Sequence, residues 1–561
     1  MSGLSRSRVR GGTDLPLIEH TIGAQLDATS RRWGDRPALV SVHQGVRWSW
    51  AELAERVDAW AAGMHALGLG RGDRVGIWAH NGWEWLVTQL ATARLGIVLV
   101  NINPAYRTAE LTYALNKVGC KALIAMAEYR SSDYMAMLRE VAPELPDCEP
   151  GALRAARVPE LRLVVRLDGE RSPGMLNFGD LPGHARAAAG RAPADLGAAL
   201  DRNDPVNIQF TSGTTGRPKG ATLTHRNILN NGHLVGEAIR LGEQDRLCVP
   251  VPLYHCFGMV MGNLACLTHG ACIVYPAPAF DAASVLEAVE CERCTGLYGV
   301  PTMFIAEMAE PAFPETDLSS LRTGIMAGSP CPREVMRRVI GEMHMGQVTI
   351  AYGMTETSPV SFQTSPEDAL EQRVSTVGRI QPHLEAKVVD ADGRVVPRGA
   401  AGELCTRGYS VMQGYWDDPV RTREAIDADG WMHTGDLATL DGDGYCRIVG
   451  RIKDMIIRGG ENIYPREVEE FLYAHPAVED VQVVGVPDPK YGEELCAWVR
   501  LRPGENVTEE DIRAFARGRI AYHKIPRYIR FVEEFPLTVT GKVRKFVIRD
   551  RMIEELHLHE R

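Results

Sequence analysis

The chain has 561 residues, so more than one domain is expected, and its 45% hydrophobic and 24% charged residues are ordinary for a globular protein. The formal net charge of -10 argues against a nucleic-acid-binding protein, which usually presents a basic surface. No apolar run approaches the roughly 20 residues of a membrane-spanning helix, so no integral membrane segment is expected. The basic, serine-rich start "MSGLSRSRVRGG" lacks the apolar segment of a secretory signal. It is expected to be frayed, with a fragment of a transit peptide as the alternative.

The 12 cysteines are scattered through apolar runs. Cys291 and Cys294 form one C-x-x-C pair, but no second pair stands at the spacing of a zinc ribbon. We therefore expect reduced core thiols in a cytoplasmic protein, with a metal site as the alternative.

Helix and strand signals alternate through the first 200 residues. Ser49 and Glu52 form a capping box that opens a helix, and Gly68 can close it. A second helix is predicted over 82–96. The predicted buried strands are 74–79, 97–102 and 122–126. This alternation indicates parallel sheets covered by helices, and ligands in such folds bind at the carboxyl ends of the strands.

The later parts of the chain change character. Residues 167–197 are rich in Gly, Pro and Ala and are expected to be a surface excursion or linker. Residues 385–450 contain Asp-Gly turns between alternating strands, which predicts β-hairpins. After Arg451 a compact α+β pattern begins, with Thr508 and Asp511 capping its last predicted helix.

The expected fold class is therefore α/β. A large N-terminal domain of parallel or mixed sheets covered by helices, with a β-rich subdomain, spans residues 1–450. A small, mobile α+β C-terminal domain spans residues 451–561.

The stretch 210–220, "FTSGTTGRPKG", follows a good strand at 206–210 and concentrates glycines, hydroxyls and one lysine. Glycines allow close backbone approach, successive backbone N–H groups form an anion site, and the lysine adds a positive charge. The loop is therefore predicted to bind a polyphosphate. Its candidate ligands are Thr211, Ser212, Gly213, Thr214, Thr215, Gly216 and Lys219.

Two common phosphate motifs do not match this loop. An ordinary P-loop places its lysine at the start of a helix, but Lys219 stands between Pro218 and Gly220. The dinucleotide pattern G-x-G-x-x-G is absent as well. A flexible turn without a ligand would be a sufficient explanation for three or four of these residues. It is a poor explanation for the whole eleven-residue string.

The string "FTSGTTGRPKG" closely resembles the signature of the adenylate-forming superfamily, which includes acyl-CoA synthetases, carrier-loading adenylation domains and firefly luciferase. "AYGMTETSP" (351–359) resembles its second nucleotide motif. The resemblance implies that Tyr352 stacks on the adenine, Gly353 belongs to the ATP-binding residues, Thr355 bonds the α-phosphate and Glu356 holds Mg²⁺. Without the resemblance, a helix N-cap at Thr355 followed by an acid in the first turn is an equal reading.

Four further segments match in family order. "AGSP" (327–330) implies that Gly328, Ser329 and Pro330 lie along the adenine. "GWMHTGDLA" (430–438) implies that Asp436 accepts hydrogen bonds from the ribose hydroxyls.

"GRIKDMIIRGGENIYPREVE" (450–469) implies that Arg451 contacts ribose or phosphate and that Lys453 is the hinge. In the same segment Gly459 and Gly460 would admit coenzyme A. "PLTVTGKVRK" (536–545) implies that Lys542 is the mobile catalytic lysine. A solvated basic cluster with Arg544 and Lys545 is the alternative.

The family reaction has two halves. A carboxylate attacks the α-phosphorus of ATP, giving an acyl-adenylate and pyrophosphate, and a thiol then takes the acyl group and releases AMP. The Lys219 ammonium and a Mg²⁺ ion held by Glu356 would offset the pyrophosphate charge. Lys542 would bridge the carboxylate and the α-phosphate. Rotation of the C-terminal domain about Lys453 would clear Lys542 before the thiol enters.

"PVPLYHCFGMVMG" (250–262) resembles the loop beside the acyl pocket. The candidate pocket residues are His255, Phe257, Met261, Val300 and Met326. These are mostly apolar, which favours an aliphatic acid, and the whole string most resembles medium-chain acyl-CoA synthetases of the family-member-2 type. An aryl acid stays open.

The expected partners are a small carboxylic acid, ATP and coenzyme A. The chain ends 19 residues after Lys542, which makes coenzyme A the simplest acceptor. A stand-alone carrier protein is the enzymatic alternative, and an ATP-binding sensor is the non-enzymatic one. A homodimer is compatible with the sequence.

Overall fold

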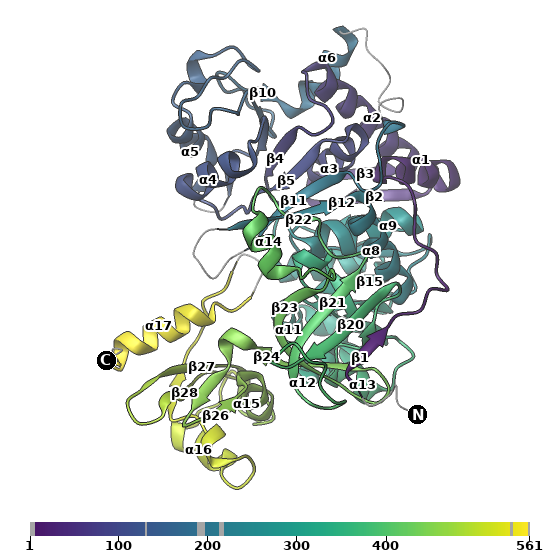
Figure 1. Cartoon of the computed structure of the whole chain (residues 1–561). Coiled ribbons are helices and arrows are strands. Elements are labelled where there is room, and N and C mark those ends of the chain that lie inside the picture. The colour runs from purple at the N-terminus through teal and green to yellow at the C-terminus, as the bar shows by residue number, and fades with distance from the viewer. Residues whose placement is uncertain (1–5, 130–131, 188–196, 212–217, 539–541, 559–561) are drawn as a thin grey trace.

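The structure is a computed structural model that describes residues 6–129, 132–187, 197–211, 218–538 and 542–558. The structure contains two large α/β sheets, a third antiparallel sheet and a small C-terminal α+β unit, and each of the three sheets takes strands from separate parts of the chain (Figure 1). The predicted α/β class is confirmed. No helix among these residues is both long and apolar enough to cross a membrane.

The first large sheet has eight strands in the order β10-β9-β6-β4-β5-β11-β12-β22. Neighbours from β10 to β11 run parallel, whereas β12 runs antiparallel to both of its neighbours. Its strands are β4 (Arg74–Trp78), β5 (Val98–Asn101), β6 (Ala122–Ala125), β9 (Leu163–Arg166), β10 (Leu176–Asn177), β11 (Pro205–Thr211), β12 (Lys219–Thr224) and β22 (Gly414–Tyr415). The helices in this part of the chain are α1 (Ile22–Trp33), α2 (Trp50–Ala66), α3 (Trp83–Leu95), α4 (Thr108–Val118), α5 (Tyr134–Val141) and α6 (Leu181–Ala187).

The second sheet has nine strands in the order β19-β18-β17-β16-β15-β13-β14-β2-β3, parallel from β17 to β2 and antiparallel at both edges. Its strands are β2 (Pro37–Ser41), β3 (Val46–Ser49), β13 (Arg246–Cys248), β14 (Cys272–Tyr275), β15 (Gly296–Gly299), β16 (Thr323–Ala327), β17 (Gln347–Gly353), β18 (Val360–Gln363) and β19 (Arg379–Ile380). Its helices are α8 (His225–Ala238), the π-helix η4 (Phe257–Leu264), α9 (Ala265–His269), α10 (Ala282–Glu292), α11 (Pro301–Ala309), α12 (Arg333–Glu342) and α13 (Leu370–Ser375).

The predicted hairpins form a five-stranded antiparallel sheet in the order β1-β20-β21-β23-β24. Its elements are β1 (Arg8–Arg10), β20 (Leu384–Val389), β21 (Gly402–Gly408), α14 (Pro419–Ala425), β23 (Met432–Leu440) and β24 (Cys446–Arg451). The expectation of a frayed start is wrong from Arg6 onward, because Arg6 bridges to Pro397 and β1 pairs with β20 (Figure 1). Backbone pairing with distant strands orders this segment. A short basic sequence does not indicate such pairing by itself.

The C-terminal unit contains β25 (Ile456–Arg458), β26 (Glu461–Ile463), α15 (Pro465–Leu472), β27 (Val478–Asp488), β28 (Gly492–Leu501), α16 (Glu509–Ala516), β29 (Tyr528–Phe531) and α17 (Lys545–Glu555). Its two hydrophobic clusters consist of residues from 456 onward, as a separate domain requires. The boundary at 450 stays a prediction, and β24 itself continues to Arg451.

The remaining short elements are η1 (Val42–Gln44), β7 (Glu128–Tyr129), β8 (Ser132–Asp133), η2 (Leu145–Asp147), η3 (Phe178–Asp180), η5 (Phe313–Glu315), η6 (Thr355–Thr357), η7 (Ile452–Asp454) and η8 (Tyr522–Lys524).

The capping boxes at Ser49 and Thr508 are both present. The cysteines are free thiols and ten are buried, as expected; Cys291 is exposed and Cys148 is half-buried.

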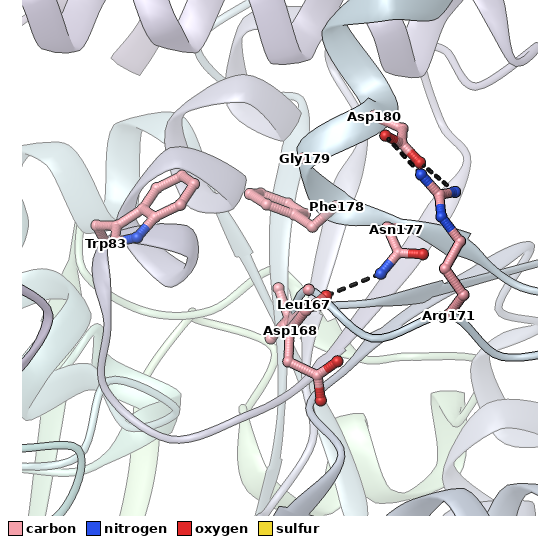
Figure 2. Close-up of a pocket in the computed structure, with 9 residues that line it drawn as sticks. Trp83, Leu167, Asp168, Arg171, Asn177, Phe178, Gly179 and Asp180 are labelled. Atoms are coloured by element: carbon pink, nitrogen blue, oxygen red, sulfur yellow. Dashed lines mark hydrogen bonds and ion pairs between the residues drawn. The ribbon is translucent and has the colours of Figure 1, made fainter.

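The segment predicted as a surface excursion or linker is packed onto the first sheet between residues 167 and 187, so it is not a free linker there. Strand β10 pairs with β9, and Phe178 is 1% exposed. The Trp60 indole N–H donates to the Phe178 carbonyl, 3.1 Å away. Phe178 and Trp83 line a cavity of about 220 Å³. Figure 2 shows both rings among the residues that line it, together with the Arg171–Asp180 ion pair. Two strand residues and one aromatic anchor are too few to produce a detectable period.

Candidate active site

The hairpin β11–β12 brings Thr211 opposite Lys219 in register, so the first and last of the phosphate-loop candidates lie side by side. Thr211 donates a hydrogen bond of 3.1 Å to Oε1 of Glu356, which is 5% exposed. Tyr415 donates to the same oxygen at 2.8 Å and accepts from the Lys219 ammonium at 2.8 Å. One tyrosine hydroxyl therefore links the loop lysine to the candidate metal carboxylate.

Charge and burial act in opposite directions on Lys219. Burial lowers its pKa, whereas the nearby Glu356 carboxylate acts to raise it. Lys219 begins β12 and not a helix, which confirms the distinction from a P-loop. Ser212, Gly213, Thr214, Thr215 and Gly216 lie outside the described residues.

A second group forms where β17 meets the antiparallel pair β23–β24. The Tyr352 hydroxyl donates to Oδ2 of Asp436 at 2.6 Å, and Nε of Arg451 donates to Oδ1 at 3.1 Å. Asp436 pairs with Arg451 in register across the two strands and is 7% exposed. The structure thus brings together three residues, predicted separately, that lie up to 99 positions apart in the numbering.

Lys542 reaches the same region from the C-terminal unit. A Cβ built on Gly328 would lie 3.9 Å from Cε of Lys542, so the lysine stem lies over the start of the "AGSP" strip. Gly328 has a φ of 91°, which a side chain would strain. Ser329 and Pro330 follow directly after β16, at its carboxyl end.

Protein atoms around Lys542 lower its pKa, and the positive charge of Arg451 adds to this effect. Lys542 is nevertheless exposed to solvent, so it is not sealed inside the protein. Asp436 and Glu356 pull in the opposite direction, which places the lysine within electrostatic reach of both carboxylates. The alternative of an isolated solvated basic cluster does not describe this position.

The nucleotide motif at 351–359 spans the end of β17, which carries Tyr352, and the short helix η6, which carries Glu356. Gly353 ends β17, and Thr355 is the first residue of η6. The N-cap position belongs to Met354, so the alternative reading of Thr355 as the cap is wrong. Its hydroxyl is therefore not required for capping.

The acyl-pocket candidates divide between two faces of the second sheet. Phe257, Met261 and Val300 pack in one cluster, where the Phe257 and Tyr298 rings are 5.4 Å apart. Met326 lies in the other cluster, with Phe304. Because side chains alternate along a strand, Ile325 takes the inner position and Met326 points to the opposite face. The structure therefore does not bring Met326 together with Phe257, Met261 and Val300.

His255 precedes Phe257 by two residues and lies within electrostatic reach of Lys542. Burial, followed by the nearby Lys542 charge, lowers its pKa to about 3, so the imidazole is neutral at physiological pH. The hinge candidate Lys453 lies exposed in η7 and acts electrostatically on Lys219. Gly459 and Gly460 form the exposed turn between β25 and β26, with φ of 60° and 88°.

Tyr415 is the main residue that sequence reasoning missed. It lies on β22, nearly 200 positions after Lys219, and pairs with β12 through Ala221. Nothing in "MQGYWDDP" marks it as a site residue. Only the pairing of β22 with β12 could have found it.

A family model described as "AMP-binding enzyme" matches residues 26–416, and "AMP-binding enzyme C-terminal domain" matches residues 467–542. The chain belongs to the AMP-binding enzyme family. This confirms the resemblance seen in the motifs.

Two curated relatives span nearly the whole chain. "Medium-chain acyl-CoA ligase ACSF2, mitochondrial" of Rattus norvegicus is 47% identical over 98% of this chain and 91% of that protein. "Putative acyl-CoA synthetase YngI" of Bacillus subtilis is 49% identical over 97% of this chain and 99% of that protein.

Two solved structures share the fold. The anthranilate CoA ligase AuaEII, in complex with anthranoyl-AMP, superposes with a TM-score of 0.84 at 26% identity, covering 96% of this chain and 98% of that chain. ATP-bound MatB from Rhodopseudomonas palustris superposes with a TM-score of 0.81 at 29% identity, covering 95% and 99%. Both match this chain across its large and small parts, which supports the α/β class with a smaller C-terminal unit.

Proposed function

We propose that this chain is an AMP-forming acyl-CoA synthetase that activates a medium-chain fatty acid through an acyl-adenylate and transfers it to coenzyme A. The observation that carries the proposal is the position of Lys542 beside Gly328, within reach of Glu356 and Asp436. The two relatives named as an acyl-CoA ligase and a putative acyl-CoA synthetase support the acceptor.

In the first half-reaction, a carboxylate oxygen of the acid attacks the α-phosphorus of ATP and the bond to the pyrophosphate breaks. Lys542 stabilises the negative charge that develops between the two anions. Lys219 and the loop beside it bind the leaving pyrophosphate, while Asp436 and Arg451 hold the ribose. In the second half-reaction the thiol sulfur attacks the acyl carbon, and AMP leaves.

The residues around Glu356 fit a magnesium ion bound with ATP. The carboxylate is buried and is joined by the Thr211 hydroxyl, so two oxygen donors of the kind that Mg²⁺ prefers converge. Bound there, the ion would offset phosphate charge. Tyr415 and Thr211 orient Glu356 for this role through their hydrogen bonds.

The acid is proposed to enter beside His255. Phe257, Met261 and Ile325 belong to one apolar cluster, which suits an alkyl chain. The neutral His255 adds no charge next to Lys542. Homodimerisation and a cytoplasmic location stay predictions from the sequence.

The test is a chain-length series. The purified protein, Mg²⁺ and ATP are incubated with saturated acids from short to long, with and without coenzyme A, beside Lys542→Ala. We expect pyrophosphate and acyl-CoA with a maximum at medium chain length, and loss of both in the variant. Adenylate without thioester would move the acceptor to a carrier protein, and turnover of aryl acids alone would reject the fatty acid.

A further inference from the structure

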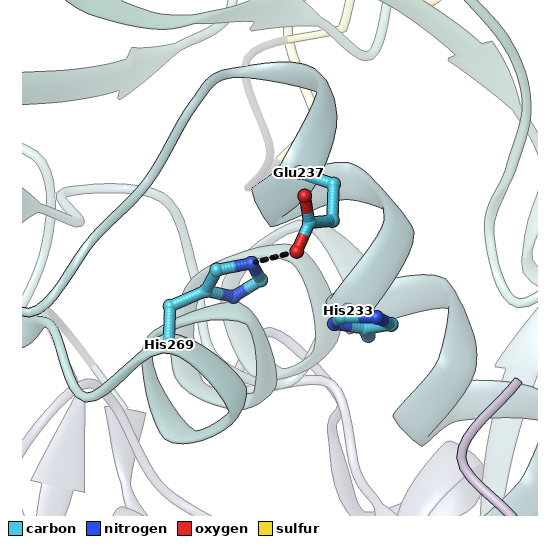
Figure 3. A group of neighbouring side chains, drawn as sticks. All are labelled: His233, Glu237 and His269. Atoms are coloured by element: carbon cyan, nitrogen blue, oxygen red, sulfur yellow. Dashed lines mark hydrogen bonds and ion pairs between the residues drawn. The ribbon is translucent and has the colours of Figure 1, made fainter. Parts of the chain in front are cut away.

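Two histidines and a glutamate meet away from the residues assigned to the reaction. His233 and Glu237 lie one turn apart on α8, and His269 is the last residue of α9 (Figure 3). Residues four apart on a helix share a face, so both α8 side chains point towards α9. One ligand atom from each of the three side chains lies within 4.8 Å of the other two.

The hydrogen bonds of His269 favour one state of its ring. Nδ1 lies 2.9 Å from the Ala265 carbonyl oxygen, which can only accept, and 2.9 Å from the Thr268 hydroxyl. That hydroxyl has the Leu264 and Ala265 carbonyl oxygens as its own acceptors, and when it donates to either of them Nδ1 carries a proton. In the neutral ring Nε2 then bears a lone pair, and it faces Oε1 of Glu237. Two acceptors face each other only if a proton or a metal cation lies between them. A backbone carbonyl that holds the far nitrogen is the usual second partner of a metal-binding histidine.

The distances favour the metal. Nε2 of His269 and Oε1 of Glu237 are 3.3 Å apart. A charge-assisted hydrogen bond is usually about 2.7–2.9 Å long, whereas two ligands on a tetrahedral ion with bonds of about 2.0–2.1 Å lie about 3.3 Å apart. The His233 and His269 rings are 5.4 Å apart between centroids. Two imidazoles on one such ion would be separated by about 5 Å.

The neighbouring residues position the His269 ring and leave one nitrogen of His233 without a hydrogen-bond partner. The His269 ring packs directly on Gly236, where a Cβ would lie 2.4 Å from Cε1, so the glycine makes room for the ring. Nδ1 of His233 is buried and has no hydrogen-bond partner among the described residues. The His269 side chain is 8% exposed and that of Glu237 is 40% exposed, so solvent reaches the cluster from one side.

We propose that His233, Glu237 and His269 bind a divalent transition-metal ion of the zinc type, with water in the fourth position. Two imidazoles and one carboxylate are a donor set that zinc accepts in proteins. The ion would tie α8 to α9. Helix α8 follows the strand of Lys219, and α9 continues the π-helix that carries Phe257 and Met261. The site would therefore stiffen the helical layer behind the reaction centre without entering the reaction.

A second cluster provides the sharpest rival. Glu403, Cys405 and His433 also lie within 4.8 Å of one another. Nδ1 of His433 already lies 2.8 Å from Glu403, a normal length for a charged hydrogen bond. Burial raises the pKa of Cys405 to about 12, which disfavours the thiolate that a metal needs.

The experiment uses the full chain in a Cys291→Ser background, because Cys291 is an exposed thiol. Chelator-treated protein is titrated with Zn²⁺ against a chromophoric chelator, in the absence of ATP and Mg²⁺. We expect one tightly bound equivalent, at least about tenfold weaker in His233→Ala, His269→Ala and Glu237→Gln. His65→Ala serves as the histidine control and should bind as the parent does.

Two further readouts decide the outcome. Co²⁺ should give ligand-field absorption without a thiolate charge-transfer band. Zn²⁺ should raise the Tm of the parent but not that of Glu237→Gln. The Glu237 side chain is exposed, so this change should not disturb the fold. Equal binding by the three cluster variants, a thiolate band, or loss of binding only in His433→Ala would overturn the proposal. So would the absence of stoichiometric Zn²⁺ binding by the parent.

Discussion

The Tyr415 hydroxyl joins the two charges on which the proposed chemistry depends. It accepts from Lys219 and donates to Glu356, each at 2.8 Å. The Lys219 ammonium also lies 4.1 Å from the centre of its ring. The tyrosine hydroxyl therefore lies between Lys219 and Glu356 and links them through two hydrogen bonds in place of a direct ion pair.

Tyr415→Phe should lower pyrophosphate formation roughly tenfold to a hundredfold, because Glu356 loses one of its donors and Lys219 loses its acceptor. The ring remains, so the Tm should change little. The measurement is ATP–pyrophosphate exchange with a saturating acid. Tyr445→Phe is the matched control, since it removes a hydroxyl bonded to Asp368 away from these residues. Equal losses in both variants would contradict a specific role for Tyr415.

Lys542 should give adenylation an alkaline limit. Its pKa is lowered, so the ammonium is lost as pH rises through a value below the usual lysine pKa of about 10.4. ATP–pyrophosphate exchange without coenzyme A should therefore fall on the alkaline side, because the charge that bridges the reacting anions is lost.

Lys219 also has a lowered pKa, so each lysine needs its own control. Arginine stays charged, and Lys542→Arg should remove the alkaline limb from the residual activity. Lys219→Arg should keep it. A limb that disappears only in Lys219→Arg would assign the titration to the phosphate loop.

At the scale of elements, local signals were enough wherever a cap or a period lies within one segment. The Ser49–Glu52 and Thr508–Asp511 boxes opened the helices that they predicted. Elements made by long-range pairing were missed. Strand β1 finds its partner more than 370 positions away, and β10 is two residues long.

The same limit explains the site. Residues inside recognisable motifs, such as Asp436 and Glu356, could be named from sequence. Tyr415 could not, because its role comes from the pairing of β22 with β12. The separation of Met326 from the other pocket candidates could not be predicted either, because the pleat of β16 decides the face that each side chain takes.

Helix α11 carries a buried carboxylic acid that lowers the stability of the fold at high pH. Glu307 is fully buried, and neither carboxylate oxygen has a hydrogen-bond partner among the described residues. Burial raises its pKa to about 8. The folded state therefore keeps the proton over a range where the unfolded chain loses it, so stability falls as pH rises from the unfolded value towards 8.

Glu307→Gln should remove this pH dependence. The variant should gain stability over the parent by up to about 1.4 kcal/mol for each pH unit between the unfolded pKa and 8. Urea unfolding at pH 5.5 and at pH 8 measures the difference, which should be larger at pH 8. A gap that is equal at both values would mean that the carboxyl finds a partner and does not titrate in this range.

At the scale of the whole molecule, the small unit supplies one residue to a site built by the large one. Lys542 lies beside Gly328 and acts on His255, while the clusters of the small unit contain residues from 456 onward. The Gly459–Gly460 turn belongs to the same unit and is exposed. We propose that rotation about Lys453 withdraws Lys542 and brings this turn to the thiol.

Lys453→Pro tests the rotation. Proline fixes its own φ and restricts Ile452 before it, so the hinge loses the freedom to change conformation. If the orientation seen here is the one that adenylates, pyrophosphate formation should persist while thioester formation slows at least about tenfold. Single-turnover assays of each half-reaction measure the two rates, and Lys453→Ala, which keeps the backbone free, should preserve both. Equal slowing of both half-reactions by proline would show that residue 453 supports the fold and is not a pivot, because a pivot affects only the step that follows the rotation.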